Sequence, residues 1–221
     1  MRTYWFSADI HDEHTNCIHL TQRPFKNVEE MRQTIVGNIN KKVKPDDVLY
    51  LLGDVCLGKK DAWVSLLDSI TCKNVILVVG NHDRWASIPK DKILMAADVI
   101  RLRAHGRILL LSHYPYRCSW LRAFLKRLHP AVLSKKRPLD TGLWLLHGHD
   151  HRKMQLCDYH PRQFNVGVDA NKFSPVSISA IISTIQQQEE LRKQGTFRSR
   201  ARTMLDKVST KIRGLPTIGR R

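Results

Sequence analysis

The sequence predicts an α/β domain built around two β-sheets. Strand-like and helix-like segments alternate from residue 4 to residue 79 in the order βαβαβ, which is typical of a parallel sheet with covering helices. After Asp83 this alternation ends, and strand-like segments follow one another with no clear helix between most of them. This pattern indicates a second sheet, mixed or antiparallel, that packs on the first. The chain of 221 residues suffices for one such domain with a small appendage.

Apolar spacing and turn residues indicate the elements of the first part. A buried strand at residues 4–8 is followed by a loop that closes near residues 23–25. Asn27 with Glu30 three residues later is an N-cap signature, and apolar residues at helical spacing extend that helix to about Val43. The next elements are a strand at residues 48–52, a helix at residues 61–70 and a strand at residues 74–79.

In the second part, four strand-like segments precede a final helix. The strands are expected at residues 98–102, 107–112, 143–147 and 163–168, and the helix at residues 177–194. Residues 116–141 form an irregular basic segment. Beyond Gly195, an apolar stripe on a basic background predicts an amphipathic helix or a partly disordered tail. We therefore expect a catalytic domain over residues 1–194 and a basic C-terminal extension over residues 195–221.

The composition favours a cytoplasmic protein without disulfide bonds. The five cysteines are scattered and form no CxxC spacing, which favours a reducing compartment and thiols that act as packing residues. The first residues lack the basic and apolar regions of a signal peptide. The longest apolar runs, at residues 75–79 and 108–111, are far shorter than the ~20 residues that span a bilayer. The sequence leaves the oligomeric state open.

The net charge of +17 is concentrated in two parts of the chain. Residues 192–221 hold ten basic residues and one acid, and residues 101–137 hold ten basic residues and no acid. Either run would attract polyanions, such as nucleic acid, an anionic membrane or a phosphorylated substrate, and either would equally serve as a solvated surface. The apolar stripe of the tail would dock on a partner protein or on its own domain.

Five short polar stretches carry metal-ligand side chains, and the first three directly follow predicted strands. Ligands of open α/β sheets bind at the carboxyl ends of the strands, so we expect these stretches to meet there. The candidate ligands are two carboxylates, an amide and four imidazoles: Asp9, His11, Asp54, Asn81, His113, His149 and His151. Seven ligands are too many for one tetrahedral zinc but suit two ions that share a carboxylate, for which Asp54 is the candidate. Mixed nitrogen and oxygen donors favour Mn²⁺, with Fe or Zn²⁺ as alternatives.

Each stretch alone is a weak signal, since a single residue such as His113 is more often a core histidine, but the ordered set is specific. Asp9-x-His11, Gly53-Asp54, Gly80-Asn81-His82-Asp83, His113 and Gly148-His149-x-His151 resemble the motifs of the calcineurin-like metallophosphoesterases, in their small single-domain branch. The resemblance implies that Asp9, His11 and His151 hold one ion. It implies that Asn81, His113 and His149 hold the other, and that Asp54 bridges the two. The implied fold is a four-layer α/β/β/α sandwich, with two packed mixed β-sheets flanked by helices.

The resemblance places His82 outside the ligand set, facing the substrate. We expect this histidine to stabilise charge on the phosphoryl group and to protonate the leaving oxygen as a general acid. Four further residues are candidates for substrate contacts or for support of the ligands: His14, Arg23, Asp83 and Asp150. Asp83 and Asp150 would orient imidazoles. His147 matches no ligand position and is expected to pack.

The motifs predict a metal-dependent phosphoesterase that hydrolyses phosphomonoesters or phosphodiesters by in-line attack of a metal-bridging hydroxide. Protein phosphatases of this superfamily carry an Asp-Arg pair shortly after Gly-Asp, where this chain has residues 55–58 with the sequence VCLG. This departure argues against a protein substrate. Basic residues interleaved with Tyr114, Tyr116 and Trp120 favour a nucleotide or nucleic-acid substrate. The alternatives are a nucleic-acid- or membrane-surface-binding protein in which the basic C-terminal helix carries the main role, and a binding module without catalysis.

Overall fold

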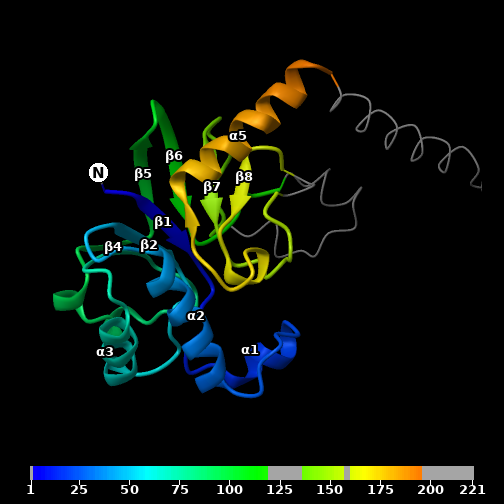
Figure 1. The fold of residues 1–221 in the computed structure, drawn as a ribbon. Coiled ribbons are helices and arrows are strands. Elements are labelled where there is room, and N and C mark those ends of the chain that lie inside the picture. The colour runs from blue at the N-terminus through cyan, green and yellow to red at the C-terminus, as the bar shows by residue number, and fades with distance from the viewer. Residues whose placement is uncertain (1, 119–135, 157–159, 196–221) are drawn as a thin grey trace, which may run out of the picture. The chain divides into compact units, whose positions relative to one another are not determined.

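The structure is a computed structural model that describes residues 2–118, 136–156 and 160–195 (Figure 1). Residues up to Ile178 form one compact unit, which contains both β-sheets, and the residues from Ser179 onward form a second unit. Most of the basic segment and the extension from residue 196 onward lie outside the described residues. What we predict for them stays a prediction.

The first sheet has the strand order β4-β3-β2-β1-β9. Its strands are β1 (Tyr4–Ser7), β2 (Val48–Leu52), β3 (Asn74–Val78), β4 (Met95–Ala97) and β9 (Val176–Ser177). Strands β1 to β4 run parallel, and β9 pairs antiparallel with β1. Every residue of the central strand β2 is buried, as expected for a parallel strand that is covered on both faces.

The second sheet has the order β5-β6-β7-β8. Its strands are β5 (Val99–Ala104), β6 (Arg107–Ser112), β7 (Trp144–His147) and β8 (Gln163–Asn165). Strands β5 and β6 form an antiparallel hairpin, whereas β7 runs parallel to β6 and β8 parallel to β7. The prediction of two mixed sheets flanked by helices is therefore confirmed.

Helix α2 spans Val28–Lys42 and begins at the predicted N-cap. The Asn27 backbone is extended, and its side-chain oxygen accepts a hydrogen bond from the backbone N–H of Glu30 at 2.8 Å. The Glu30 carboxylate in turn accepts one from the backbone N–H of Lys26 at 2.8 Å. These local contacts satisfy N–H groups that the first turn of a helix leaves unpaired, which explains where α2 starts.

The apolar face of α2 shares one buried cluster with helix α3 (Lys60–Ser69) and the first sheet. Met31 and Ile35 from α2, Trp63 from α3 and Leu49 from β2 are all completely buried there. Their packing holds the parallel strands in a rigid layer, so the loops that leave the carboxyl ends of these strands start from well-defined positions.

Helix α5 (Ile178–Lys193) makes up most of the described part of the second unit and agrees with the helix predicted at residues 177–194. Among the residues that the structure describes, three short 3₁₀ helices lie in loops: η1 (Trp85–Ser87), η2 (Lys90–Lys92) and η4 (Val168–Ala170). Among the described residues, none of the helices has the length and apolar character that a bilayer crossing requires.

Four elements differ from the prediction. The loop expected after the first strand contains helix α1 (Thr15–Leu20), and the short strands β4 and β9 complete the first sheet. Helix α1 has six residues, of which only Cys17 and Ile18 are buried, so it carries no helical apolar period that a sequence would reveal. The strand predicted at residues 163–168 ends at Asn165, because the chain turns into η4 at Val168.

Replacing Asn27 by Ala removes the side-chain acceptor for Glu30 N–H, and we expect the free energy of unfolding to fall by about 1 kcal/mol. Asn27→Ser keeps a capping oxygen and should stay within roughly a few tenths of a kcal/mol of the wild type. Urea denaturation followed by circular dichroism measures both variants. Equal destabilisation by both would show that the cap is not the source of the effect.

Candidate metal centre

The ligand candidates of the first sheet lie at one edge because β1, β2 and β3 are parallel. Asp9 follows β1, Asp54 follows β2 and Asn81 follows β3. Backbone hydrogen bonds continue past the strand ends: Asp9 N–H donates to Gly53 O, and His11 N–H donates to Asp54 O, each at 3.0 Å. The loops after β1 and β2 therefore run side by side, at the edge where ligands of such sheets bind.

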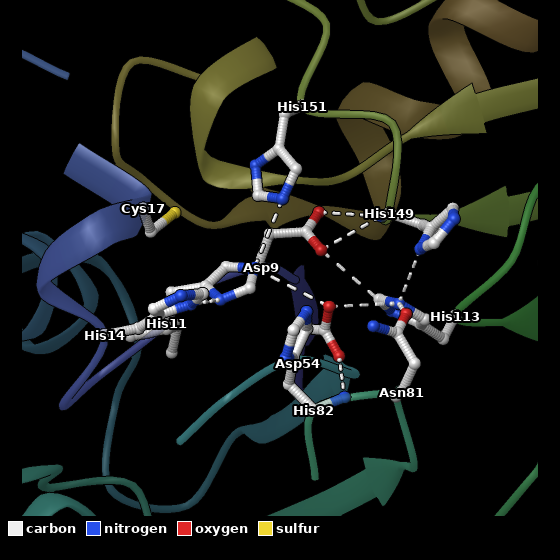
Figure 2. Close-up of polar contacts among 12 residues, drawn as sticks. Asp9, His11, His14, Cys17, Asp54, Asn81, His82, His113, His149 and His151 are labelled. Atoms are coloured by element: carbon white, nitrogen blue, oxygen red, sulfur yellow. Dashed lines mark hydrogen bonds and ion pairs between the residues drawn. The ribbon is translucent and has the colours of Figure 1, made fainter. Parts of the chain in front are cut away.

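The second sheet supplies three histidines to the same place. His113 follows β6, and His149 and His151 follow the parallel strand β7. The backbone N–H of Gly148 donates to His113 O at 3.1 Å, which ties these two loops together. Figure 2 shows that the seven predicted ligands, from both sheets, gather around a common centre.

One donor group consists of Asp9, His11 and His151, whose ligand atoms lie within 4.8 Å of one another. His11 Nε2 and His151 Nε2 face each other at 3.2 Å. The Asp9 carboxylate is completely buried, and the backbone N–H of His149 lies 2.9 Å from each of its oxygens. Two ring nitrogens and a carboxylate that converge in this way are a suitable donor set for a divalent ion.

A second donor group consists of Asp54, His113 and His149, again within 4.8 Å of one another. His113 Nε2 lies 3.2 Å from His149 Nδ1, 3.0 Å from Asn81 Oδ1 and 3.3 Å from Asp54 Oδ2. Asp54 Oδ2 also lies 3.6 Å from His11 Nε2, in the first group. Asp54 therefore stands between the two groups.

Outer hydrogen bonds determine which nitrogen faces the centre in two of the rings. His113 Nδ1 lies 3.0 Å from Leu52 O, and His151 Nδ1 lies 2.8 Å from a carboxylate oxygen of Asp169. A carbonyl and a carboxylate only accept, so Nδ1 of each ring carries a proton and donates it. In the neutral ring, Nε2 then points its lone pair at the centre, which is the arrangement of metal-binding histidines.

Buried negative charge dominates the electrostatics. Burial raises the pKa of Asp9 to about 6. Although burial disfavours a charged His113, its hydrogen bond to Asp54 and the charges of Asp9 and Asp54 raise the pKa of this imidazole to about 9. A proton on His113 thus supplies positive charge that the carboxylates require, and divalent cations would supply it instead and release that proton. The residues present fit a metal centre.

The backbone is strained at five of the predicted ligands. Asp9, His11, Asp54, His149 and His151 have φ values between 47° and 72°. Residues other than glycine rarely adopt this left-handed conformation, which costs about 1–3 kcal/mol for each residue. Such strain persists only where the surrounding structure imposes it. Here it turns donor side chains from both sheets towards one point.

Two glycines allow the backbone to approach the ligand carboxylates. A Cβ atom at Gly80 would lie 2.3 Å from Asp54 Oδ1, and one at Gly148 would lie 2.5 Å from Asp9 Oδ2. Both distances are far below van der Waals contact, so any larger residue would displace a carboxylate. The glycines of these two motifs are therefore required by close packing against the ligands.

The same arrangement belongs to a known family. Residues 3–166, which include all seven predicted ligands, match the profile of the calcineurin-like phosphoesterases. The chain belongs to this family. It is therefore a metal-dependent phosphoester hydrolase, and divalent metal ions are its cofactors.

Proteins from three other organisms resemble this phosphoesterase along most of their length. The uncharacterized protein MJ1445 of Methanocaldococcus jannaschii is 28% identical over 199 residues, which cover 87% of this chain and 96% of that protein. The gene 66 protein of Mycobacterium phage L5 is 30% identical, over 77% of this chain and 88% of that protein. Among solved structures, the protein of unknown function AQ665 from Aquifex aeolicus is 27% identical, with a TM-score of 0.63, and the match covers 83% of this chain and 100% of that one.

In this phosphoesterase, His82 lies beside the ligands without joining either donor group. Its ring centroid is 5.2 Å from that of His11, and its backbone N–H donates to Asp54 Oδ1 at 2.8 Å. The His82 side chain is partly exposed, whereas His11 and His113 are buried. Its placement therefore leaves the imidazole accessible to a bound substrate.

Asp83 supports the loop that carries Asp54. We expect it to orient an imidazole, but its carboxylate accepts hydrogen bonds from backbone N–H groups: those of Asp54 at 2.9 Å, Gly80 at 2.8 Å and Val55 at 2.8 Å. The conformations of two ligand loops thus depend on one buried carboxylate. Its role is to position backbone rather than a histidine.

Arg23 and Asp169 form a buried pair behind the first donor group. Arg23 Nε and a terminal nitrogen bind the two Asp169 oxygens at 2.9 and 2.8 Å, and the guanidinium also donates to Asp9 O at 2.7 Å and Ile10 O at 3.0 Å. Arg23 is only 5% exposed, and its hydrogen bonds fasten the loop that carries Asp9. Asp169, whose carboxylate bonds to the His151 ring, is not among the predicted site residues.

Two other predicted residues lie at the edge of the site. His14 Nδ1 is 3.0 Å from His11 Nδ1, so this histidine contacts a ligand directly. Asp150 accepts a hydrogen bond from the buried guanidinium of Arg137 at 3.1 Å. Arg137 and Tyr114 are not among the individually predicted site residues, although both belong to the basic and aromatic stretch expected to contact the substrate; the Tyr114 ring centroid lies 5.0 Å from that of His113.

His147 is completely enclosed at the end of β7, and burial lowers its pKa to about 4. Its Nδ1 lies 2.7 Å from Gly148 O. It belongs to neither of the two donor groups around Asp54. This position agrees with the packing role expected from the sequence.

Asp169→Asn removes the negative charge that orients the His151 ring. We expect the dissociation constant for Mn²⁺ to rise about 10–100-fold, because the outer partner of a ligating histidine sets its tautomer and basicity. Asp68→Asn is a matched control, since Asp68 is exposed and pairs only with Lys92 among the described residues. Calorimetric titration of the metal-free proteins measures the affinities. An unchanged affinity in Asp169→Asn would show that His151 does not depend on this carboxylate.

Proposed function

We propose that this phosphoesterase works with two divalent ions, one in each donor group, and that Asp54 bridges them. The observation that carries the proposal is the place of Asp54 Oδ2, 3.3 Å from His113 Nε2 and 3.6 Å from His11 Nε2. One carboxylate oxygen thus reaches both groups. Two bound ions would supply an activated water and positive charge around the phosphoryl group. The mixed nitrogen and oxygen donors favour Mn²⁺, with Fe or Zn²⁺ as alternatives.

His82 is the proton donor of the proposed reaction. Hydrolysis of a phosphate ester leaves negative charge on the departing oxygen, and an imidazole within reach can protonate it. The partial exposure of His82 makes its ring accessible, and the bond from its backbone to Asp54 keeps that ring near the centre. Four of the proposed ligands, Asp9, His11, Asp54 and His113, are buried, and His82 stands beside them as a partly exposed imidazole for the substrate.

The substrate we favour is a nucleotide or a nucleic-acid-derived phosphate ester. Tyr114 is half-buried, with its ring 5.0 Å from that of His113 and 4.8 Å from that of His149, so an aromatic surface lies next to the second donor group. Arg101 and Arg103 are exposed on β5, where they pair with Leu110 and Ile108 of β6, further from His113 than Val99, which pairs with Ser112. An aromatic side chain beside a phosphate site suits stacking on a base, and the exposed arginines add positive charge to the same sheet.

The bridging role is tested by metal content. Wild-type protein saturated with excess Mn²⁺ and then freed of unbound metal should hold two ions per chain. Asp54→Asn should lose both ions, whereas His149→Ala should lose mainly one, because only the bridge serves both groups. Elemental analysis measures the ratio. If Asp54→Asn retains two tightly bound ions, the bridging assignment is wrong.

The role of His82 is tested by leaving group. His82→Ala should keep its metals but lose about 10²–10⁴-fold in kcat on esters with a poor leaving group, where protonation matters most. Loss on a 4-nitrophenyl ester should be much smaller, because nitrophenolate leaves without a proton. His19→Ala, an exposed histidine on α1, serves as the control. Mono-, di- and cyclic phosphate esters of nucleosides are assayed side by side with the nitrophenyl ester. If His82→Ala loses the same factor in kcat on every leaving group, His82 is not the general acid.

A further inference from the structure

Three potential metal ligands follow one another at intervals of three residues after the first strand: His11, His14 and Cys17. The backbone N–H of His14 donates to His11 O at 3.1 Å, and that of Cys17 donates to His14 O at 3.0 Å. In two successive turns of this kind, side chains three residues apart lie on the same face. The ligand atoms of all three residues lie within 4.8 Å of one another.

This group differs in chemistry from the two donor groups around Asp54. It contains a thiol and two imidazoles and no carboxylate, and soft sulfur donors select thiophilic ions. We propose that His11, His14 and Cys17 form a side site for a thiophilic divalent cation such as Zn²⁺ or Cd²⁺, and that its occupancy inhibits the catalytic centre. Three protein ligands leave a fourth, tetrahedral position for water.

The surroundings of Cys17 suit this role. Cys17 is 2% exposed, and its sulfur lies 3.9 Å from Thr21 Oγ1, while the Thr21 hydroxyl donates to Cys17 O at 2.7 Å. Within the described part of the chain, a metal that binds the sulfur breaks no stronger contact than this one, and the thiol proton leaves to solvent as the sulfur–metal bond forms. His14 is partly exposed and gives an ion a way in. Figure 2 shows Cys17 on the side of the centre where His11 and His14 lie.

Inhibition follows because His11 belongs to both sites. Its Nε2 faces His151 at 3.2 Å in the catalytic centre, and its Nδ1 faces His14 at 3.0 Å in the side site. A neutral imidazole has one nitrogen lone pair, so an ion on Nδ1 competes with an ion on Nε2. Two cations on one ring also repel each other. Each ion must then weaken the binding of the other by the same factor.

Binding is tested first, without any assay of turnover. Full-length, Mn²⁺-loaded protein is titrated with Cd²⁺, and a thiolate-to-cadmium charge-transfer band should appear in the ultraviolet and saturate at one equivalent. Cys17→Ser should abolish the band, with Cys17→Ala as a second variant if serine destabilises α1. Cys72→Ser is the matched control, because Cys72 is buried far along the chain and its sulfur donates to Asp47 O. A band that persists in both Cys17 variants, or no band in the wild type, overturns the site.

The inhibitory effect rests on the proposed function and is tested separately. Zn²⁺ added to the Mn²⁺ enzyme should inhibit the wild type and Cys72→Ser, whereas Cys17→Ser should need at least about tenfold more Zn²⁺ for half-inhibition with its uninhibited turnover unchanged. Equal inhibition of Cys17→Ser would show that Zn²⁺ acts by replacing the catalytic ions, and the inhibitory role would be wrong. If no phosphate ester is turned over, the proposed function fails, while the cadmium titration still decides whether the side site exists.

Discussion

Buried negative charge is the constraint on which the rest of this protein depends. The side chains of Asp9 and Asp54 are 0% and 2% exposed and lie in the same small centre, and an uncompensated buried charge costs on the order of several kcal/mol. The backbone N–H groups of His149 and His82 donate to these carboxylates, and imidazoles surround them. Such a set is balanced when cations are bound, so the stability of the centre and its cofactor are linked.

The fold meets this constraint by holding the backbone of the ligand loops in defined conformations, which in turn position the ligand side chains. Five of the seven candidate ligands have a strained, left-handed backbone conformation, and glycines allow neighbouring loops to approach the ligands closely. Strain of this kind requires support from outside the centre. The Asp83 carboxylate accepts hydrogen bonds from backbone N–H groups of the loop after β2 and so holds that loop. Arg23 holds the loop after β1 through Asp9 O, and its partner Asp169 holds the His151 ring. Through these hydrogen bonds the two carboxylates hold the backbone of the ligand loops and the His151 ring in place.

The sequence could predict the features that reside in local pattern. The cap at Asn27, the parallel strands and the order of the ligand motifs depend on neighbours in the chain, and the structure brings all seven candidates together. Asp169 was missed because its partner His151 lies 18 positions away and meets it only through tertiary packing. Helix α1 was missed for a related reason: with two buried side chains, it lacks the apolar period that identifies longer helices.

The segment from Asp9 to Arg23 explains how so short a helix persists. Isolated helices of six residues are unstable in water, and α1 buries little of its own surface. The chain leaves the centre at Asp9, passes through α1 and returns with Arg23, whose guanidinium donates to the carbonyl oxygens of Asp9 and Ile10. Both ends of the segment are thus fastened to the same two peptide units. A displacement of α1 therefore shifts the backbone that positions Asp9 and His11. A cation bound in the proposed side site, which includes His14 and Cys17, would then act on the candidate metal ligands in two ways: through this closed loop and through the shared ring of His11.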